Sequence, residues 1–485
     1  MFFLRIFPIL LIFRIINSFL IKTFHDPDEY YQSQEIAHFK YYGYGFKTWE
    51  WSMGLRSFIY PNIFFYGYSL LNVLHLDETP LFVMFPRLFQ AFFNALTDSY
   101  TYFLAYRFFG KGPAKWALLC SLTSWFNFFS GSRTYSNNME TLFTLMAFYC
   151  WPWPTLIDKI DYNDFMISLV FASISCIFRP TSAIIWIFIG LHLLFNSKLG
   201  QWLKILAVSS GILSLSFLFS LLIDYGFYQK LTFVPWNFLK FNLIEKVSTF
   251  YGTHPWHWYI SQGIPLVGFT HLPFAFLGVF KGVPMIVRKT RDNTYHHAIL
   301  IDKSLFHVAC WITFAYSLLS HKEFRFVSTL LPIISIYSGC CLYKFSKNIS
   351  NSDVNNEDES EKLLKKDFTK STKKNNQKKI KKLNEKKSNK LGIGLFVLVV
   401  TNVLMGYYFC LVHQRGVVDV IFWLRRRVME KKELSSKNDR LMAIYNIPVD
   451  SVLILMPCHS TPFQSVLHSN EVSFRFLTCE PPIEE

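Results

Sequence analysis

Three carboxylates stand within four positions in the segment "HDPDEYYQSQ", residues 25–34. Asp26, Asp28 and Glu29 follow a run of almost pure hydrocarbon, "FFLRIFPILLIFRIINSFLI". Ionisable groups are costly to place at a membrane and usually mark a functional site. A carboxylate there can take a proton from a hydroxyl group, as a general base does in glycosyl transfer. The acid cluster is therefore the first candidate for chemistry.

Four further segments gather polar and aromatic residues: "GYGFKTWEW", "RTYSNNMET", "FYGTHPWHWYISQG" and "HKEFRF". Each one alone would read as an interfacial loop, because Trp and Tyr prefer the lipid headgroup level. His254 and His257 have a spacing that could suggest a metal site. No acid follows at ligand spacing, however, and Trp256 and Trp258 alternate with the two histidines, so we expect no metal.

Five such loops together indicate one site. Aromatic rings suit sugar faces and lipid chains, whereas Arg and Lys suit a phosphate. The implied substrate is a carbohydrate carried on a lipid phosphate. We expect Arg325 to pair with the donor phosphate, with help from His321 and with Lys322 beside it, while Arg179 lies at a similar level. The other candidate substrate-binding residues in these loops are Trp49, Glu50, Arg133, His254, Trp256 and His257.

The composition is that of a polytopic membrane protein. Of the 485 residues, 51% are hydrophobic and 17% charged, and the apolar residues come in runs of about 17 to 25, long enough to cross a bilayer as helices. The net charge of +16 is concentrated in residues 361–390, which hold 13 Lys against 3 acids. A lysine-rich stretch with a single aromatic residue, Phe368, predicts a disordered linker, so we expect no nucleic-acid partner.

The distribution of Lys and Arg orients the chain, because basic loops stay in the cytosol. It predicts about eleven spans, near residues 2–21, 81–106, 116–131, 138–154, 165–179, 181–196, 205–223, 263–280, 304–320, 326–343 and 392–412. The five polar segments then all fall on the lumenal side, in loops 22–80, 132–137, 224–262 and 321–325. Within the first loop, "YPNIFFYGYSLLNVL" is expected to be interfacial or re-entrant. The basic "LRRRVMEKKE" of the lumenal tail is the exception to the rule.

These boundaries predict an all-α membrane protein. Residues 1–347 form the transmembrane core, 348–391 a disordered cytosolic linker, 392–412 the last span and 413–485 a small lumenal tail. In the tail, "SVLILMPCHSTPF" and "VSFRFLTC" read as short strands. Of nine cysteines, only Cys458 and Cys479 lie in this polar tail. We expect them to form a disulfide, since the lumen is oxidising.

Several of these segments resemble a known family. "PDEYYQSQEIAH", "YGYGFKTWEW" and "LRSFIYP" resemble the first lumenal loop of the dolichol-phosphate-mannose-dependent mannosyltransferases of the GT-C class, and "RTYSNNMET" and "RPTSAI" match later blocks. More narrowly, "NFLKFNLIEKVSTFYGTHPWHWYISQG", "THLPF", "SHKEFRF" and "LMPCHSTPF" resemble the branch that adds the third mannose in GPI-anchor assembly. The resemblance covers residues 24–479 except the lysine-rich insert.

The resemblance implies a GT-C fold in the endoplasmic-reticulum membrane with a lumenal active site. It implies an inverting transfer of mannose from dolichol-phosphate-mannose, in α1,2 linkage, to the second mannose of the GPI-lipid acceptor. It also implies no metal or other cofactor, because Arg and Lys can stabilise a monophosphate leaving group. The chain departs from the family at Asp26, where fewer acids are usual, and this leaves the identity of the base less sharply defined.

The two adjacent acids cannot share one pocket. On a helix starting there, Asp28 and Glu29 point about 100° apart, so one should be the base and the other structural. We expect Asp28 to be the base, because the family motif begins its acid pair there and its short side chain is more rigidly placed. Glu29 would orient the acceptor or pair with a base such as His25. A carboxylate partly withdrawn from water should have a raised pKa.

Two other functions fit parts of the pattern. One is a sister mannosyltransferase that builds the lipid-linked N-glycan precursor; only "HPWHWY" and the "LMPCHST" tail argue against it. The other is a membrane transporter with its acids as proton relays. Transporters place such groups near mid-span and often contain repeats, whereas these acids lie at span ends and no internal repeat is evident.

Overall fold

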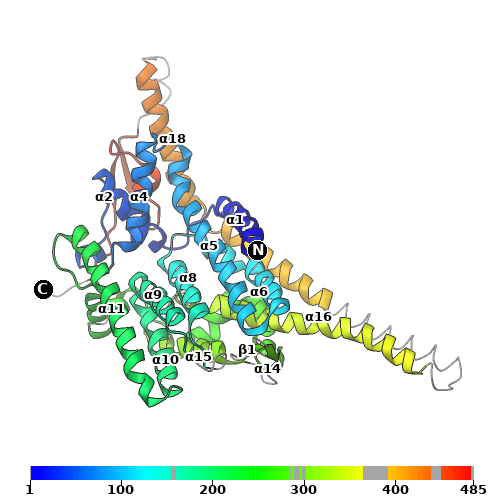
Figure 1. The fold of residues 1–485 in the computed structure, drawn as a ribbon. Coiled ribbons are helices and arrows are strands. Elements are labelled where there is room, and N and C mark those ends of the chain that lie inside the picture. The colour runs from blue at the N-terminus through cyan, green and yellow to red at the C-terminus, as the bar shows by residue number, and fades with distance from the viewer. Residues whose placement is uncertain are drawn as a thin grey trace.

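The computed structural model of the chain is mostly helical (Figure 1). It describes residues 2–154, 160–245, 247–283, 286–288, 295–297, 302–363, 391–437 and 449–481. The long helices are α1 (Phe2–Leu20), α5 (Pro80–Phe109), α6 (Lys111–Thr123), α8 (Ser136–Cys150), α9 (Tyr162–Phe178), α10 (Ala183–Phe195), α11 (Leu199–Tyr228), α14 (Leu272–Lys281), α15 (Ser304–Ser317), α16 (Leu330–Leu363) and α18 (Gly416–Lys437). There are also two small two-stranded sheets in the described part: β1 (Ile286–Arg288) pairs with β2 (Tyr295–His297), and β3 (Ser451–Ile454) pairs with β4 (Ser473–Phe476).

The core of the bundle depends on close helix packing. α6 packs along α16 and α5, and α8 packs between α5 and α9. Gly339 allows the closest approach: a Cβ there would lie 2.3 Å from the backbone nitrogen of Ala117. Gly278 has the same function between α14 and α16, where a Cβ would lie 1.9 Å from the carbonyl oxygen of Tyr337. Small residues at such crossings are typical of helices that pack within membranes.

Three continuous helices in the described part are long and apolar enough to cross a membrane by length and composition: Leu199–Tyr228, Tyr259–Lys281 and Leu391–Val412. The spans predicted near 81–106 and 326–343 lie largely in the longer helices α5 and α16, and several others are present as shorter or broken helices. The span expected at 116–131 is divided at Ser124, between α6 and the short α7 (Trp125–Ser130). In α11 most side chains are exposed, including Leu203 at 80%, as expected of a surface that faces lipid.

The loop predicted to be lumenal, residues 22–80, is largely helical. It contains a π-helical turn, η1 (Tyr30–Gln34), and the helices α2 (Glu35–Tyr42), α3 (Trp49–Ser52) and α4 (Ile59–Val73). The last of these covers the segment expected to be interfacial or re-entrant. α2 packs against α4, and α4 also contacts η1.

The C-terminal tail packs onto this loop, and both share one hydrophobic cluster. Two strands occur where the sequence predicted them, β3 (Ser451–Ile454) and β4 (Ser473–Phe476), and they pair in parallel. The structure joins Cys458 and Cys479 in a disulfide with their Cα atoms 5.7 Å apart, the pairing expected from the sequence. The short α19 (Gln464–Leu467) contacts α2 and α18. Figure 1 shows α2, α4 and the base of α18 side by side.

Two sequence-based expectations need correction. Helix α18, which contains the basic "LRRRVMEKKE", was not predicted. Its Arg425 is buried and donates to the carbonyl of Val466 at 2.7 Å, so this charge serves tertiary packing. The linker expected from residue 348 is wrong in its first part, because α16 continues as helix to Leu363. Residues 364–390, the rest of the linker, lie outside the described residues.

Candidate active site

Arg325 is the centre of an ion cluster at the loop that follows α1. It belongs to the short helical turn η7 (Phe324–Val327). Its Nη2 lies 2.5 Å from Asp28 Oδ2, and its Nε lies 3.4 Å from Asp26 Oδ2. Glu323 binds the same guanidinium through both carboxylate oxygens, at 2.5 and 2.9 Å. The structure thus brings the "HDPDE" and "HKEFR" segments together, with Arg325 6% exposed and Asp28 23% exposed.

Local backbone chemistry fixes Asp28 at this position. Asp26 Oδ1 accepts a hydrogen bond of 2.9 Å from the backbone N–H of Asp28, closing a tight turn over Pro27. The carbonyl of Pro27 then accepts the N–H groups of Tyr30 and Tyr31, which starts the helical segment. Asp28 is therefore held where the extended chain leaving α1 becomes helix.

The electrostatics distinguish the acids. Burial raises the pKa of Asp26 to about 7, although the Arg325 guanidinium acts in the opposite direction. Burial also lowers the pKa of His25 to about 3, helped by Arg133 and Arg325. The His25 ring, 3.7 Å from Asp26, is therefore neutral and provides no counter-charge. Burial alone would raise the pKa of Glu323, but Arg325 and His321 hold it well below its usual range.

Glu29 lies in the protein interior and pairs with two arginines. Its carboxylate is fully buried and binds Arg87 at 3.0 Å and Arg133 at 2.6 Å. The expectation that Glu29 pairs with His25 is wrong, because two arginines occupy its oxygens. Arg133 also donates to the carbonyl of Thr23 and is itself fully buried. The expectation that Arg133 binds substrate is therefore not supported by its placement, since it lies in the protein interior.

Two neighbours of Arg325 also serve mainly to hold loops. His321 Nδ1 lies 3.1 Å from the carbonyl oxygen of Gly252, and Nε2 lies 2.9 Å from Glu323. Lys322 is buried, and its ammonium donates to the carbonyls of His254 and Leu319. Lys322 was expected beside Arg325 among the substrate-binding residues, but its charge instead joins the loop 224–262 to the "HKEFR" loop.

Two more arginines lie close to this cluster. Arg179 binds Glu140 at 3.3 Å and faces the Phe326 ring, over which the Arg325 guanidinium also lies. The Arg179 side chain is itself buried. The sequence analysis missed Arg56 although its segment, "LRSFIYP", was noted. Arg56 pairs with Glu50 at 2.9 Å, and Asp28 contributes to its raised pKa.

The remaining candidates form the outer part of this region. The Trp49 ring stacks parallel to Tyr251, with centroids 6.0 Å apart. His254 stacks on Trp258, and His257 lies against Ser261. Trp256 is 68% exposed. The contacts described for these four side chains do not include the ion cluster around Arg325. Their expected role in substrate binding therefore stays a prediction. Within the described residues, no group of three or more His, Cys, Asp or Glu could hold a metal ion.

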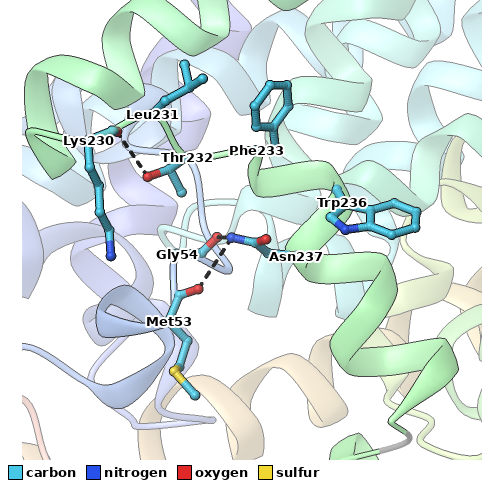
Figure 2. Close-up of a pocket in the computed structure, with 8 residues that line it drawn as sticks. All are labelled: Met53, Gly54, Lys230, Leu231, Thr232, Phe233, Trp236 and Asn237. Carbon is cyan, nitrogen blue, oxygen red and sulfur yellow. Dashed lines mark hydrogen bonds between the residues drawn. The ribbon is translucent and has the colours of Figure 1, made fainter.

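A well-defined cavity of the described part lies elsewhere. It has a volume of about 630 Å³ and lies between the turn after α3 and the start of α12 (Val234–Leu239) (Figure 2). Gly54 and Asn237 face one another there, and Asn237 donates to the Gly54 carbonyl at 3.2 Å. Lys230 and Trp236 lie to either side. No carboxylate lines this cavity, so we assign the chemistry to the ion cluster instead.

Comparison with known proteins identifies the family. A profile of the Alg9-like mannosyltransferase family matches residues 5–468. A mannosyltransferase of Arabidopsis thaliana is 37% identical over 99% of this chain and 78% of its own length. GPI mannosyltransferase 3 of Drosophila melanogaster is 34% identical over 99% of this chain and 72% of its own. GPI alpha-1,2-mannosyltransferase 3 of Homo sapiens is 33% identical over 97% and 71%.

A solved structure supports the fold. The crystal structure of ArnT from Cupriavidus metallidurans bound to undecaprenyl phosphate superposes with a TM-score of 0.56 at 10% identity, covering 96% of this chain and 84% of that one. The expected GT-C membrane fold is thereby confirmed. With the family profile matching nearly the whole chain and relatives above 30% identity along its length, this multi-pass membrane protein belongs to the Alg9-like mannosyltransferase family.

Proposed function

We propose that this protein transfers mannose from dolichol-phosphate-mannose, in α1,2 linkage, to the second mannose of the GPI-anchor precursor. The reaction would take place on the lumenal side of the endoplasmic-reticulum membrane. Relatives named GPI mannosyltransferase 3 support the acceptor and the linkage. The observation that carries the mechanism is the contact of Asp28 with Arg325, at 2.5 Å, next to the first span.

In this mechanism Asp28 is the general base. It accepts the proton of the acceptor hydroxyl while that oxygen attacks C1 of the donor mannose. The bond between C1 and the phosphate oxygen breaks, and the bonding electrons leave with the dolichol phosphate. Attack from the face opposite the leaving group inverts the configuration at C1. The proton remains on Asp28 until it is released to solvent after the product leaves.

Arg325 is the residue we assign to the leaving group. Its Nε and Nη2 donate to carboxylates, whereas Nη1 donates to no carboxylate among the described residues. We assign Nη1 to an oxygen of the donor phosphate, which gains negative charge as the C1–O bond breaks. Arg56 and Arg179 lie close enough to influence the same region electrostatically. Their positive charge offsets the carboxylates that surround Arg325.

The test is transfer by purified protein in detergent. The protein would be given dolichol-phosphate-mannose and a GPI lipid carrying two mannoses, with a lipid-linked N-glycan precursor as the matched alternative acceptor. We expect one mannose on the GPI lipid, removable by an α1,2-specific mannosidase, and no product with Asp28→Asn. Transfer only to the N-glycan precursor, or a product resistant to that mannosidase, would overturn the proposal.

A further inference from the structure

His459, in the tail segment "LMPCHSTPF", is held in an unfavourable backbone conformation. Its φ angle is 55°, in the left-handed region that non-glycine residues adopt at some cost. The disulfide-bonded Cys458 immediately precedes it. Such local strain persists only where the surrounding structure enforces it, and it occurs most often at functional sites.

The side chain of His459 has aromatic walls and an unsatisfied nitrogen. Its ring centroid lies 4.6 Å from that of Tyr31 and 5.3 Å from that of Phe46. Its Nδ1 is buried and has no hydrogen-bond partner among the described residues. A buried polar atom without a partner is destabilising, and native proteins seldom retain one without a functional reason.

The imidazole also lies near the proposed base. Burial lowers the pKa of His459, and the Asp28 carboxylate is close enough to act against that shift. Tyr31, which contacts the ring, is three residues after Asp28 on the same helical segment. Side chains three apart lie on neighbouring parts of a helix surface. His459 of the tail and Asp28 of the first loop therefore lie near one another.

A separate clamp keeps the tail in this position. Glu35 of α2 is fully buried, and its carboxylate accepts the backbone N–H of Phe463 at 2.8 Å and the Ser465 hydroxyl at 2.5 Å. Tyr31 donates its hydroxyl to the carbonyl of Thr461 at 3.1 Å. The disulfide and these hydrogen bonds fix the tail on both sides of His459.

We propose that His459 binds the acceptor sugar, with Nδ1 hydrogen-bonded to a hydroxyl next to the one that Asp28 deprotonates. The buried Tyr31 ring would fix the orientation of the imidazole, and the half-buried Phe46 ring would pack against the apolar face of the same sugar. This inference rests on the proposed function, because it takes the acceptor to be a mannose. The C-terminal tail then recognises the acceptor, while Arg325 and its neighbours bind the donor.

The test separates recognition from folding. His459→Gly removes the imidazole and also relieves the left-handed backbone, so its melting temperature should equal or exceed that of the wild type. We expect at least a tenfold fall in kcat/KM for the acceptor, the size of one lost hydrogen bond to a sugar hydroxyl, with an unchanged KM for the donor. His459→Phe keeps the ring contacts without a nitrogen and should show the same loss.

His75→Gly is the matched control. His75 has the same φ of 55° but is exposed in the turn after α4, so its variant should gain stability without a kinetic change. The inference is overturned if His459→Gly keeps acceptor kcat/KM within twofold of the wild type. It is also overturned if stability and donor kinetics fall together with acceptor kinetics. Should the wild type use a different acceptor sugar, the proposed function fails, and these variants are measured with that acceptor.

Discussion

The adjacent acids Asp28 and Glu29 should have opposite mutant phenotypes. In Glu29→Gln the side chain keeps its shape but loses its charge. Two guanidiniums, those of Arg87 and Arg133, then lie buried without the carboxylate that now binds them at 3.0 and 2.6 Å. Leaving a buried charge without its partner typically costs about 3–5 kcal/mol. Since the total stability of a domain is on the order of 5–15 kcal/mol, we expect this variant to be poorly folded.

The backbone hydrogen bonds of these two arginines should extend the effect of Glu29→Gln to the neighbouring segment. Arg87 donates to the carbonyl of Ile21 at 2.7 Å, and Arg133 donates to the carbonyl of Thr23 at 2.8 Å. Both therefore hold the segment between α1 and the acid cluster. If either guanidinium moved to find water or another anion, the backbone that presents Asp28 would move with it. Any activity lost in Glu29→Gln should follow the loss of folded protein.

Asp28→Asn should behave differently, because this side chain is 23% exposed and has one ion pair, with Arg325. We expect normal abundance and a normal melting temperature, with transfer reduced about 10²–10⁴-fold, as for loss of a general base. Both variants would be compared in membranes for protein level, for thermal aggregation in detergent and for mannose transferred per molecule of folded protein. The reasoning is refuted if Glu29→Gln is as stable as the wild type yet inactive. It is refuted equally if Asp28→Asn keeps activity within a few-fold of wild type.

Three further results are expected. Burial raises the pKa of Asp26 from its ordinary 3.8 to about 7. Between these pH values the folded state holds a proton that the unfolded state has lost, so the free energy of unfolding should fall as pH rises. The melting temperatures of Asp26→Asn at pH 5 and pH 8 should therefore differ less than those of the wild type. Gly54→Ala should destabilise by about 1–3 kcal/mol, since φ is +65° and a Cβ would lie 2.6 Å from Thr232; a wild-type melting temperature would contradict this. Cys458→Ser and Cys479→Ser should each lower the free energy of unfolding by about 3 kcal/mol. Reducing the disulfide of the wild type should lower it by the same amount, which denaturation with and without reductant would measure.

The sequence predicted most of the elements whose signal is local. Apolar runs located α1, α5 and the last span within a few residues, because hydropathy needs no knowledge of neighbours. The strands β3 and β4 followed from β-branched and apolar composition, and the expected pairing of Cys458 and Cys479 followed from their isolation in a polar tail. Helix α18 was missed because its charged residues resemble a solvated loop until Arg425 is seen to bind the carbonyl of Val466.

Residue roles were harder to predict than elements, because charge in a sequence does not identify its partner. From the sequence alone, Arg133 and Arg325 are equally plausible phosphate ligands. In the structure Arg133 is fully buried against Glu29, whereas Arg325 lies at the more exposed Asp28. Lys322 is also buried, and its ammonium donates hydrogen bonds to backbone carbonyls, whereas Arg325 pairs with carboxylates. These distinctions depend on tertiary contacts between segments far apart in the chain.

The contacts also explain why two acids are adjacent at the membrane edge. Successive side chains on a helix diverge by about 100°, so when one is fixed in the core the direction of the next is determined. Glu29 is fixed by two buried arginines, and this sets the rotation of the segment that begins at Pro27. Asp28 must then point away from the core, toward Arg325. A donor anchored in the bilayer by its lipid cannot leave the interface. The proposed base, Asp28, would have to be held there, and the neighbouring buried Glu29 provides the rigidity that holds it.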